Sequence, residues 1–148
     1  MALPDRKHTL KKLGQTYLVL DVNCLFVAAS LREEVWLYNG REDAGLLERV
    51  CRAAAEFRIR GVDPDRELVT YSGGEQALLA CLLTLLLIQN LDLNARQLLL
   101  CGVWESISRE NRQRLHRYFC DAARTQGMKA YCLYDNQIHE LAREPCAS

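Results

Sequence analysis

An excess of charge of either sign is missing from this sequence. Nineteen lysine and arginine residues balance nineteen aspartate and glutamate residues, so the formal net charge is zero at pH 7. No overall field therefore draws the chain to nucleic acid or to an anionic membrane. Binding of either kind would need a local basic patch.

One helical segment, residues 106–126, carries several arginines that would suit such a patch. Acidic residues interrupt this stripe, so a solvated charged face is the favoured interpretation, and His116 on the same segment is expected to be solvated too. The arginines are Arg109, Arg112, Arg114, Arg117 and Arg124, and the acidic neighbours are Glu105, Glu110 and Asp121. The sequence gives no strong case for a nucleic-acid partner.

Long apolar runs and flexible linkers are also missing. The longest apolar run, residues 77–88, is broken by Thr84, and it is about half of the roughly 20 residues that a bilayer span needs. It predicts a buried helix. Residues 1–12 are basic but lack the apolar stretch of a signal peptide. We therefore expect a cytoplasmic protein.

Paired cysteine motifs are missing although the chain has seven cysteines. The number is odd, the spacing is wide, and no CxxC motif occurs, which disfavours both a disulfide framework and a zinc site. Free thiols in a reducing compartment are expected. No motif calls for a cofactor.

What the sequence does contain is typical of one globular domain. Its 148 residues are 49% hydrophobic and 26% charged, which is close to the composition of ordinary folded domains. We expect a basic N-terminal extension over residues 1–15, a single domain over residues 16–142, and a C-terminal tail over residues 143–148.

Apolar segments at the start of the chain predict strands. Residues 16–29 are interrupted by the polar Asp21 and Asn23, which suggests two strands around a tight turn, and residues 35–38 suggest a third. Further strands are expected at residues 68–71, 98–103 and 130–134.

Helical spacing of apolar residues predicts the helices. They are expected at residues 43–60, from the loop of residues 72–75 to about Leu91, and at residues 106–126, with a short helix from Gln137. The predicted fold is three-layer α/β, with a mixed sheet that opens in an antiparallel meander and helices on both faces.

Asp21 is the residue most open to a functional interpretation. A carboxylate at the end of an apolar strand is costly unless it is exposed at a sheet edge or paired. It would hold a divalent cation in one interpretation. In the favoured one it caps a turn beside Asn23.

The loop of residues 72–75 also has two interpretations. It would bind an anion at the start of a helix, but Ser72 and Glu75 have the spacing of a capping box, and that interpretation is favoured.

The element order and the segment of residues 18–23, Leu-Val-Leu-Asp-Val-Asn, resemble the ribonuclease H-like superfamily, which includes actin-like ATPase lobes. Within it the later elements look like the actin-like cytoplasmic scaffolds of type IV pilus and type II secretion machines. For a nuclease of this superfamily, Asp21 matches the first metal-binding carboxylate. Glu75, and Glu110 or Asp121 on the last long helix, are the candidates for the others. The opening also looks like that of PIN-type ribonucleases.

The leading functional hypothesis is a non-enzymatic interaction module that acts as a cytoplasmic scaffold in a larger assembly. Its partners would be proteins, including components of a membrane-associated assembly or further copies of the chain. Trp36, Tyr38 and Trp104 are the candidate anchors, because aromatic residues often anchor interfaces. The alternative is a metal-dependent nuclease built on Asp21, Glu75 and Asp121. A third class, a regulatory domain that binds a small ligand, would use the crevice near Ser72 and Gly102.

Overall fold

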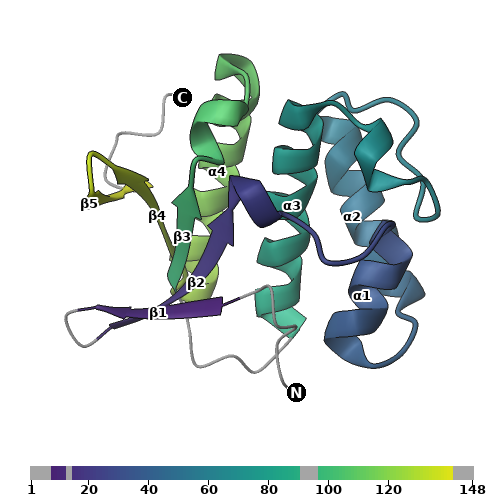
Figure 1. The fold of residues 1–148 in the computed structure, drawn as a ribbon, viewed down its shortest axis with the longest axis horizontal. Coiled ribbons are helices and arrows are strands. Elements are labelled where there is room, and N and C mark those ends of the chain that lie inside the picture. The colour runs from purple at the N-terminus through teal and green to yellow at the C-terminus, as the bar shows by residue number, and fades with distance from the viewer. Residues whose placement is uncertain (1–7, 13–14, 91–96, 142–148) are drawn as a thin grey trace.

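The fold is a mixed five-stranded sheet covered by α-helices, in a computed structural model that describes residues 8–12, 15–90 and 97–141 (Figure 1). The strands are β1 (His8–Lys12), β2 (Gln15–Asp21), β3 (Gln97–Cys101), β4 (Lys129–Tyr134) and β5 (Gln137–Glu140). They lie in the sheet in the order in which they occur in the chain. The central strands β2, β3 and β4 are parallel, and β1 and β5 pair antiparallel at the two edges. The coarse prediction of a mixed α/β fold is confirmed.

The helices connect the parallel strands. They are α1 (Leu31–Asn39), α2 (Ala44–Glu56), α3 (Gly73–Asn90) and α4 (Arg109–Gln126). Short 3-10 turns, η1 (Val22–Cys24), η2 (Leu68–Thr70) and η3 (Trp104–Ser106), lie beside them. Along the chain, the first three α-helices follow β2 and precede β3, and α4 follows β3 and precedes β4.

The described helices all lie on one side of the sheet, where α2 packs on α3 and α1 packs on α2. Their buried side chains join one core with Leu18, Leu20, Leu98 and Leu100, whereas the alternate strand positions form a separate small cluster around Tyr17, Val19 and Leu99 that contains only strand residues. Right-handed crossovers that move in one direction along a sheet place every helix on the same side. The expected arrangement with helices on both faces is therefore wrong for the described part of the chain.

Helix α3 lies at the centre of the helical layer, as Figure 1 shows. Its residues from Ala77 to Leu85 are buried, and Thr84 is the one polar side chain among them. A helix that is apolar on nearly every side needs such a central position. The prediction of a buried helix here is confirmed.

The predicted opening meander is wrong. Residues 25–30 form no strand, and residues 35–38 lie within α1. Buried Leu31, Val35 and Tyr38 recur at helical spacing, Ser30 caps the first turn, and Gly40 ends the helix with φ 69°. The antiparallel hairpin that does open the sheet lies earlier, because β1 forms within the segment expected to be an extension.

Two other predicted elements differ. Residues 68–71 form η2 and its end rather than a strand. Residues 137–140 form β5 rather than a helix, since Asp135 and Asn136 adopt positive φ angles of 50° and 60°. That conformation makes the two-residue turn of a hairpin. The strand predictions at 98–103 and 130–134 and the helix predictions at 43–60 and 106–126 are confirmed with small shifts of their ends.

Candidate functional site

Asp21 lies at the carboxyl end of β2, directly beside Cys101 of β3. Its Oδ1 accepts a hydrogen bond of 2.9 Å from the backbone N–H of Asn23 and so caps η1. Burial, and then the carboxylates of Asp21 and Glu105, raise the pKa of the Cys101 thiol. That thiol is held protonated and is a poor nucleophile.

The turn after β3 packs closely on the turn after β2. Gly102 has φ 73°, and a Cβ placed there would lie 2.7 Å from Cγ1 of Val22. Only glycine meets both demands without strain. At Gly102, one of the two residues near which a small-ligand crevice is predicted, Val22 of the protein itself occupies the space beside the backbone.

Glu75 is used by its own helix. Its carboxylate accepts from the backbone N–H of Ser72 at 2.9 Å, and its backbone N–H donates to Ser72 Oγ at 3.2 Å. This reciprocal pair is the predicted capping box. Next to it, a Cβ on Gly74 would lie 2.9 Å from the carbonyl oxygen of Ser106, so the start of α3 packs against η3.

Asp121 lies on α4 and forms an ion pair with Arg124 at 2.8 Å. Across the described residues, no three histidine, cysteine, aspartate or glutamate side chains gather as they would to hold a metal ion. Asp21, Glu75 and Asp121 are therefore not brought together. Glu110 is exposed in the first turn of α4.

The three predicted aromatic anchors have different surroundings. The Trp36 side chain is 51% exposed. Tyr38 is buried, and that burial together with the carboxylate of Glu34 raises the pKa of its hydroxyl well above the usual range. Trp104 is half-buried with its ring 6.3 Å from that of Phe119. Tyr38 is part of the core and Trp104 packs against it, so Trp36 is the most exposed of the three.

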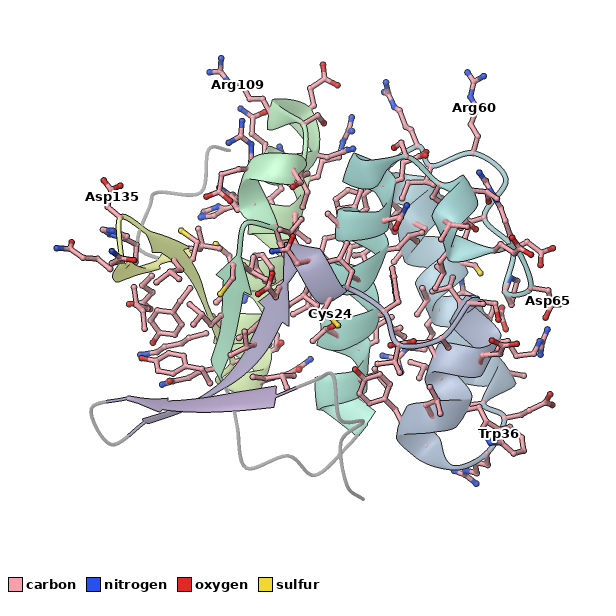
Figure 2. All side chains as sticks on the ribbon, in the orientation of Figure 1. Cys24, Trp36, Arg60, Asp65, Arg109 and Asp135 are labelled. Atoms are coloured by element: carbon pink, nitrogen blue, oxygen red, sulfur yellow. The ribbon has the colours of Figure 1, made fainter. Side chains whose placement is uncertain are left out.

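Trp36 projects from α1 away from the sheet, as Figure 2 shows. Beside it Leu37 is also exposed, and the two line a hollow of about 370 Å³. We call this the Trp36 surface; it is formed by Ala28, Arg32, Glu33, Trp36, Leu37 and Glu42.

Glu34 supports this surface from beneath, and sequence reasoning missed it. It is fully buried, and its carboxylate accepts hydrogen bonds from the backbone N–H groups of Val27, at 2.9 and 3.1 Å, and of Ala28, at 2.7 Å. Charge-assisted bonds of this kind fix an irregular segment firmly. The sequence does carry a signal for it. Leu31, Val35 and Tyr38 recur at helical spacing and define the inward face of α1, and Glu34 stands on that face.

Arg32 is also held in place. Its guanidinium donates to Asp65 through Nε at 2.7 Å and Nη2 at 3.2 Å, which lowers the pKa of Asp65 and raises that of Arg32. Glu42 lies 4.0 Å away on the other side. The Trp36 surface therefore has two carboxylates, Glu33 and Glu42, and one cation, Arg32, whose charge is paired with Asp65.

Two smaller expectations on α4 are corrected. His116 is buried rather than solvated, and its Nε2 lies 2.7 Å from the carbonyl oxygen of Leu141, just after β5. Cys120 is disulfide-bonded, so the expectation that every thiol is free fails there. Among the described cysteines, Cys24, Cys51, Cys81, Cys101 and Cys132 are not joined in disulfides.

None of the helices within the described ranges combines the length and the apolar character needed to span a bilayer. No family model, curated protein or solved structure matches the chain. Its function is therefore inferred from the geometry of its surface.

Proposed function

We propose that this chain is a non-enzymatic protein-interaction module that binds a protein partner through the Trp36 surface. The observation that carries the proposal is the exposure of Trp36 and Leu37 side by side at a hollow. Tryptophan is among the residues that most often dominate binding energy, above all where it sits at the centre of a pocketed patch.

The support beneath the surface favours binding without rearrangement. Ala28 is held by the buried carboxylate of Glu34, and Arg32 is held by Asp65. The backbone N–H of Arg32 also donates to the carbonyl oxygen of Pro64 at 3.0 Å, and that of Leu68 donates to Ala29 at 2.8 Å. A surface whose parts are already ordered loses less conformational entropy when a partner binds.

The chemistry of the rim defines the partner. An apolar hollow bordered by more carboxylates than cations fits a segment that presents a large apolar side chain flanked by lysine or arginine. The scaffold hypothesis, with a cytoplasmic location and a place in an assembly of the secretion or pilus type, is part of this proposal, as is the resemblance to ribonuclease H-like and actin-like proteins. The local use of Asp21, Glu75 and Asp121 in caps and an ion pair is consistent with it.

Selection of phage-displayed random peptides on the purified protein tests this function. We expect enriched peptides with a large apolar residue next to basic ones, and loss of binding by about tenfold or more in Trp36→Ser, because truncation of a central anchor costs 2 kcal/mol or more. Val69 is 79% exposed but lies outside this hollow, so Val69→Ser is the matched control and should bind normally.

Peptides that bind the Trp36→Ser variant as well as the unaltered protein would contradict the proposal. So would selection of acidic sequences, since these would be repelled by the rim. A photo-crosslinking residue at position 36 then identifies the partner in cells, with the same residue at position 69 as the control.

A further inference from the structure

A second hollow lies between α2, α3 and α4, away from the Trp36 surface. It has two parts that share Tyr118 and Asp121. The first part is about 260 Å³ and the second about 530 Å³. Pockets for small molecules typically occupy about 300–1,000 Å³ and often lie between packed helices. The second part falls within that range, and the first lies just below it.

The first part has an apolar floor. Leu82 and Leu85 of α3 are buried there, Leu86 is half-buried, and Ala53 and Ala122 line the flanking helices. Such a floor gains free energy by covering aliphatic carbon, about 25 cal/mol for each Å² removed from water.

The second part has uncommitted positive charge. It is lined by Glu56, Phe57, Arg114, Arg117, Tyr118 and Asp121. Asp121 pairs with Arg124, whereas Glu56 accepts a hydrogen bond from the Tyr118 hydroxyl, a neutral donor that does not offset the charge of a carboxylate. Within the described ranges neither Arg114 nor Arg117 takes part in an ion pair; Arg114 donates to the amide oxygen of Asn111 at 3.0 Å.

Tyr118 joins the two parts. Its ring packs on that of Phe57 with centroids 5.4 Å apart, and its hydroxyl reaches from α4 to Glu56 at the end of α2. The two parts therefore meet at Tyr118 and Asp121, with apolar carbon on one side and the guanidinium groups of Arg114 and Arg117 on the other.

We propose that this double hollow binds a small amphipathic organic anion, with a short aliphatic body on Leu82, Leu85 and Leu86 and a carboxylate or phosphate head at Arg114 and Arg117. Arginine recognises both kinds of head through paired hydrogen bonds. The site makes this chain a ligand-responsive module as well as a docking one, and it shares no residue with the Trp36 surface.

Isothermal titration of the full chain with octanoate and with octyl phosphate tests the proposal. We expect saturable binding of at least one at millimolar concentration or below, and the tighter of the two identifies the head group. Octanol should bind more weakly because it lacks the charge. Shortening the body from octanoate to hexanoate should weaken binding by about fourfold for each methylene that is buried.

Arg117→Gln should weaken binding by about tenfold, because it removes a charged hydrogen-bond donor. Arg109→Gln is the matched control on the same helix, since Arg109 is exposed at the start of α4 and points away from the fold in Figure 2. Leu86→Gln is a second variant at a half-buried position, and it should weaken octanoate more than it weakens inorganic phosphate.

The proposal would be overturned if neither octanoate nor octyl phosphate bound saturably. Equal binding of octanol, or full binding by Arg117→Gln, would overturn it as well. Binding of RNA or DNA that depends on Arg114 and Arg117 and displaces octanoate would replace the small anion with nucleic acid as the ligand.

Discussion

Among the residues that the structure describes, Glu34 is the one buried carboxylate. It has no exposed surface, and backbone N–H groups of Val27 and Ala28 surround its carboxylate. Glu33, its neighbour, is exposed and accepts one longer bond of 3.3 Å from Ala29. The pair offers a buried and an exposed carboxylate that differ by one position in the chain.

We predict that Glu34→Gln lowers the free energy of unfolding by about 1–3 kcal/mol, because an amide cannot accept the same set of bonds with both of its terminal atoms. Glu33→Gln should change it by less than about 0.5 kcal/mol. Denaturant titration of both variants measures the difference. Equal effects of the two substitutions would mean that the bonds to Glu34 contribute little to stability.

Substitutions of Asp21 distinguish the interaction-module hypothesis from the nuclease hypothesis. In the structure its role is to accept one backbone N–H, which asparagine also does. Asp21→Asn should therefore cost less than about 0.5 kcal/mol, whereas Asp21→Ala should cost about 1 kcal/mol. The melting temperature should not respond to millimolar Mn²⁺ in any of these proteins, and none should cleave RNA or DNA. A stabilisation by Mn²⁺ that Asp21→Asn abolishes, together with cleavage, would establish the nuclease instead.

At the scale of elements, the close contact between the turn after β2 and the turn after β3 depends on Gly102. Gly102→Ala combines a positive φ with a contact of 2.7 Å to Val22, whereas Gly40→Ala has the similar φ of 69° and no atom within 4 Å. We predict that Gly40→Ala costs about 1–2 kcal/mol from backbone strain alone. Gly102→Ala should cost about 1–3 kcal/mol more, because it also overpacks the turn.

The double variant Gly102→Ala with Val22→Ala isolates the steric part of that cost. Removing the methyl groups of Val22 should recover part of the stability lost in Gly102→Ala, and thermal denaturation of the single and double variants measures the coupling. Strict additivity of the two substitutions would show that the close approach is relieved elsewhere.

The elements that the sequence predicted well are those with a long pattern. Residues 106–126 and 43–60 carry helical spacing over several turns, and residues 98–103 form an apolar run too short for a helix. Short segments were ambiguous: Val35 to Tyr38 has the composition of a strand but lies between the cap at Ser30 and the stop at Gly40. The hairpin turn at Asp135 and Asn136 was overlooked because neither residue is glycine.

For the molecule as a whole, Tyr118 links stability to alkaline pH. Burial, and then its bond to Glu56, raise the pKa of its hydroxyl from about 10 to about 12. As the pH rises, this tyrosine ionises in the unfolded chain before it ionises in the folded one. The free energy of unfolding should therefore fall between about pH 10 and about pH 12, and the contribution of Tyr118 to stability should be fully present below pH 10.

Tyr118→Phe removes the group that titrates and tests this link. Its free energy of unfolding, measured in denaturant at pH 9 and at pH 11, should change less between the two values than that of the unaltered protein. The same dependence on pH in both proteins would assign the alkaline loss of stability to other tyrosines.

The candidate sites were harder to predict than the fold. The capping roles of Asp21 and Glu75 follow from local spacing and were favoured from the sequence. The exposure of Trp36 and the burial of Tyr38 depend on which way α1 turns its faces, and the double hollow at Tyr118 depends on how α2, α3 and α4 meet. Contacts between distant segments leave no local pattern, and the same is true of the strand order that places all the described helices on one face.

That strand order also has a consequence for synthesis on the ribosome. β2 pairs with β1 at once, but its other neighbour, β3, follows only after residues 22–96. At typical elongation rates of 5–20 residues per second, the second edge of β2 stays unpaired for roughly 4–15 s. An apolar strand with an open edge is a template for pairing with another chain. The nascent protein is therefore most exposed to aggregation while its first three α-helices are being made, and the arrival of β3 closes that interval.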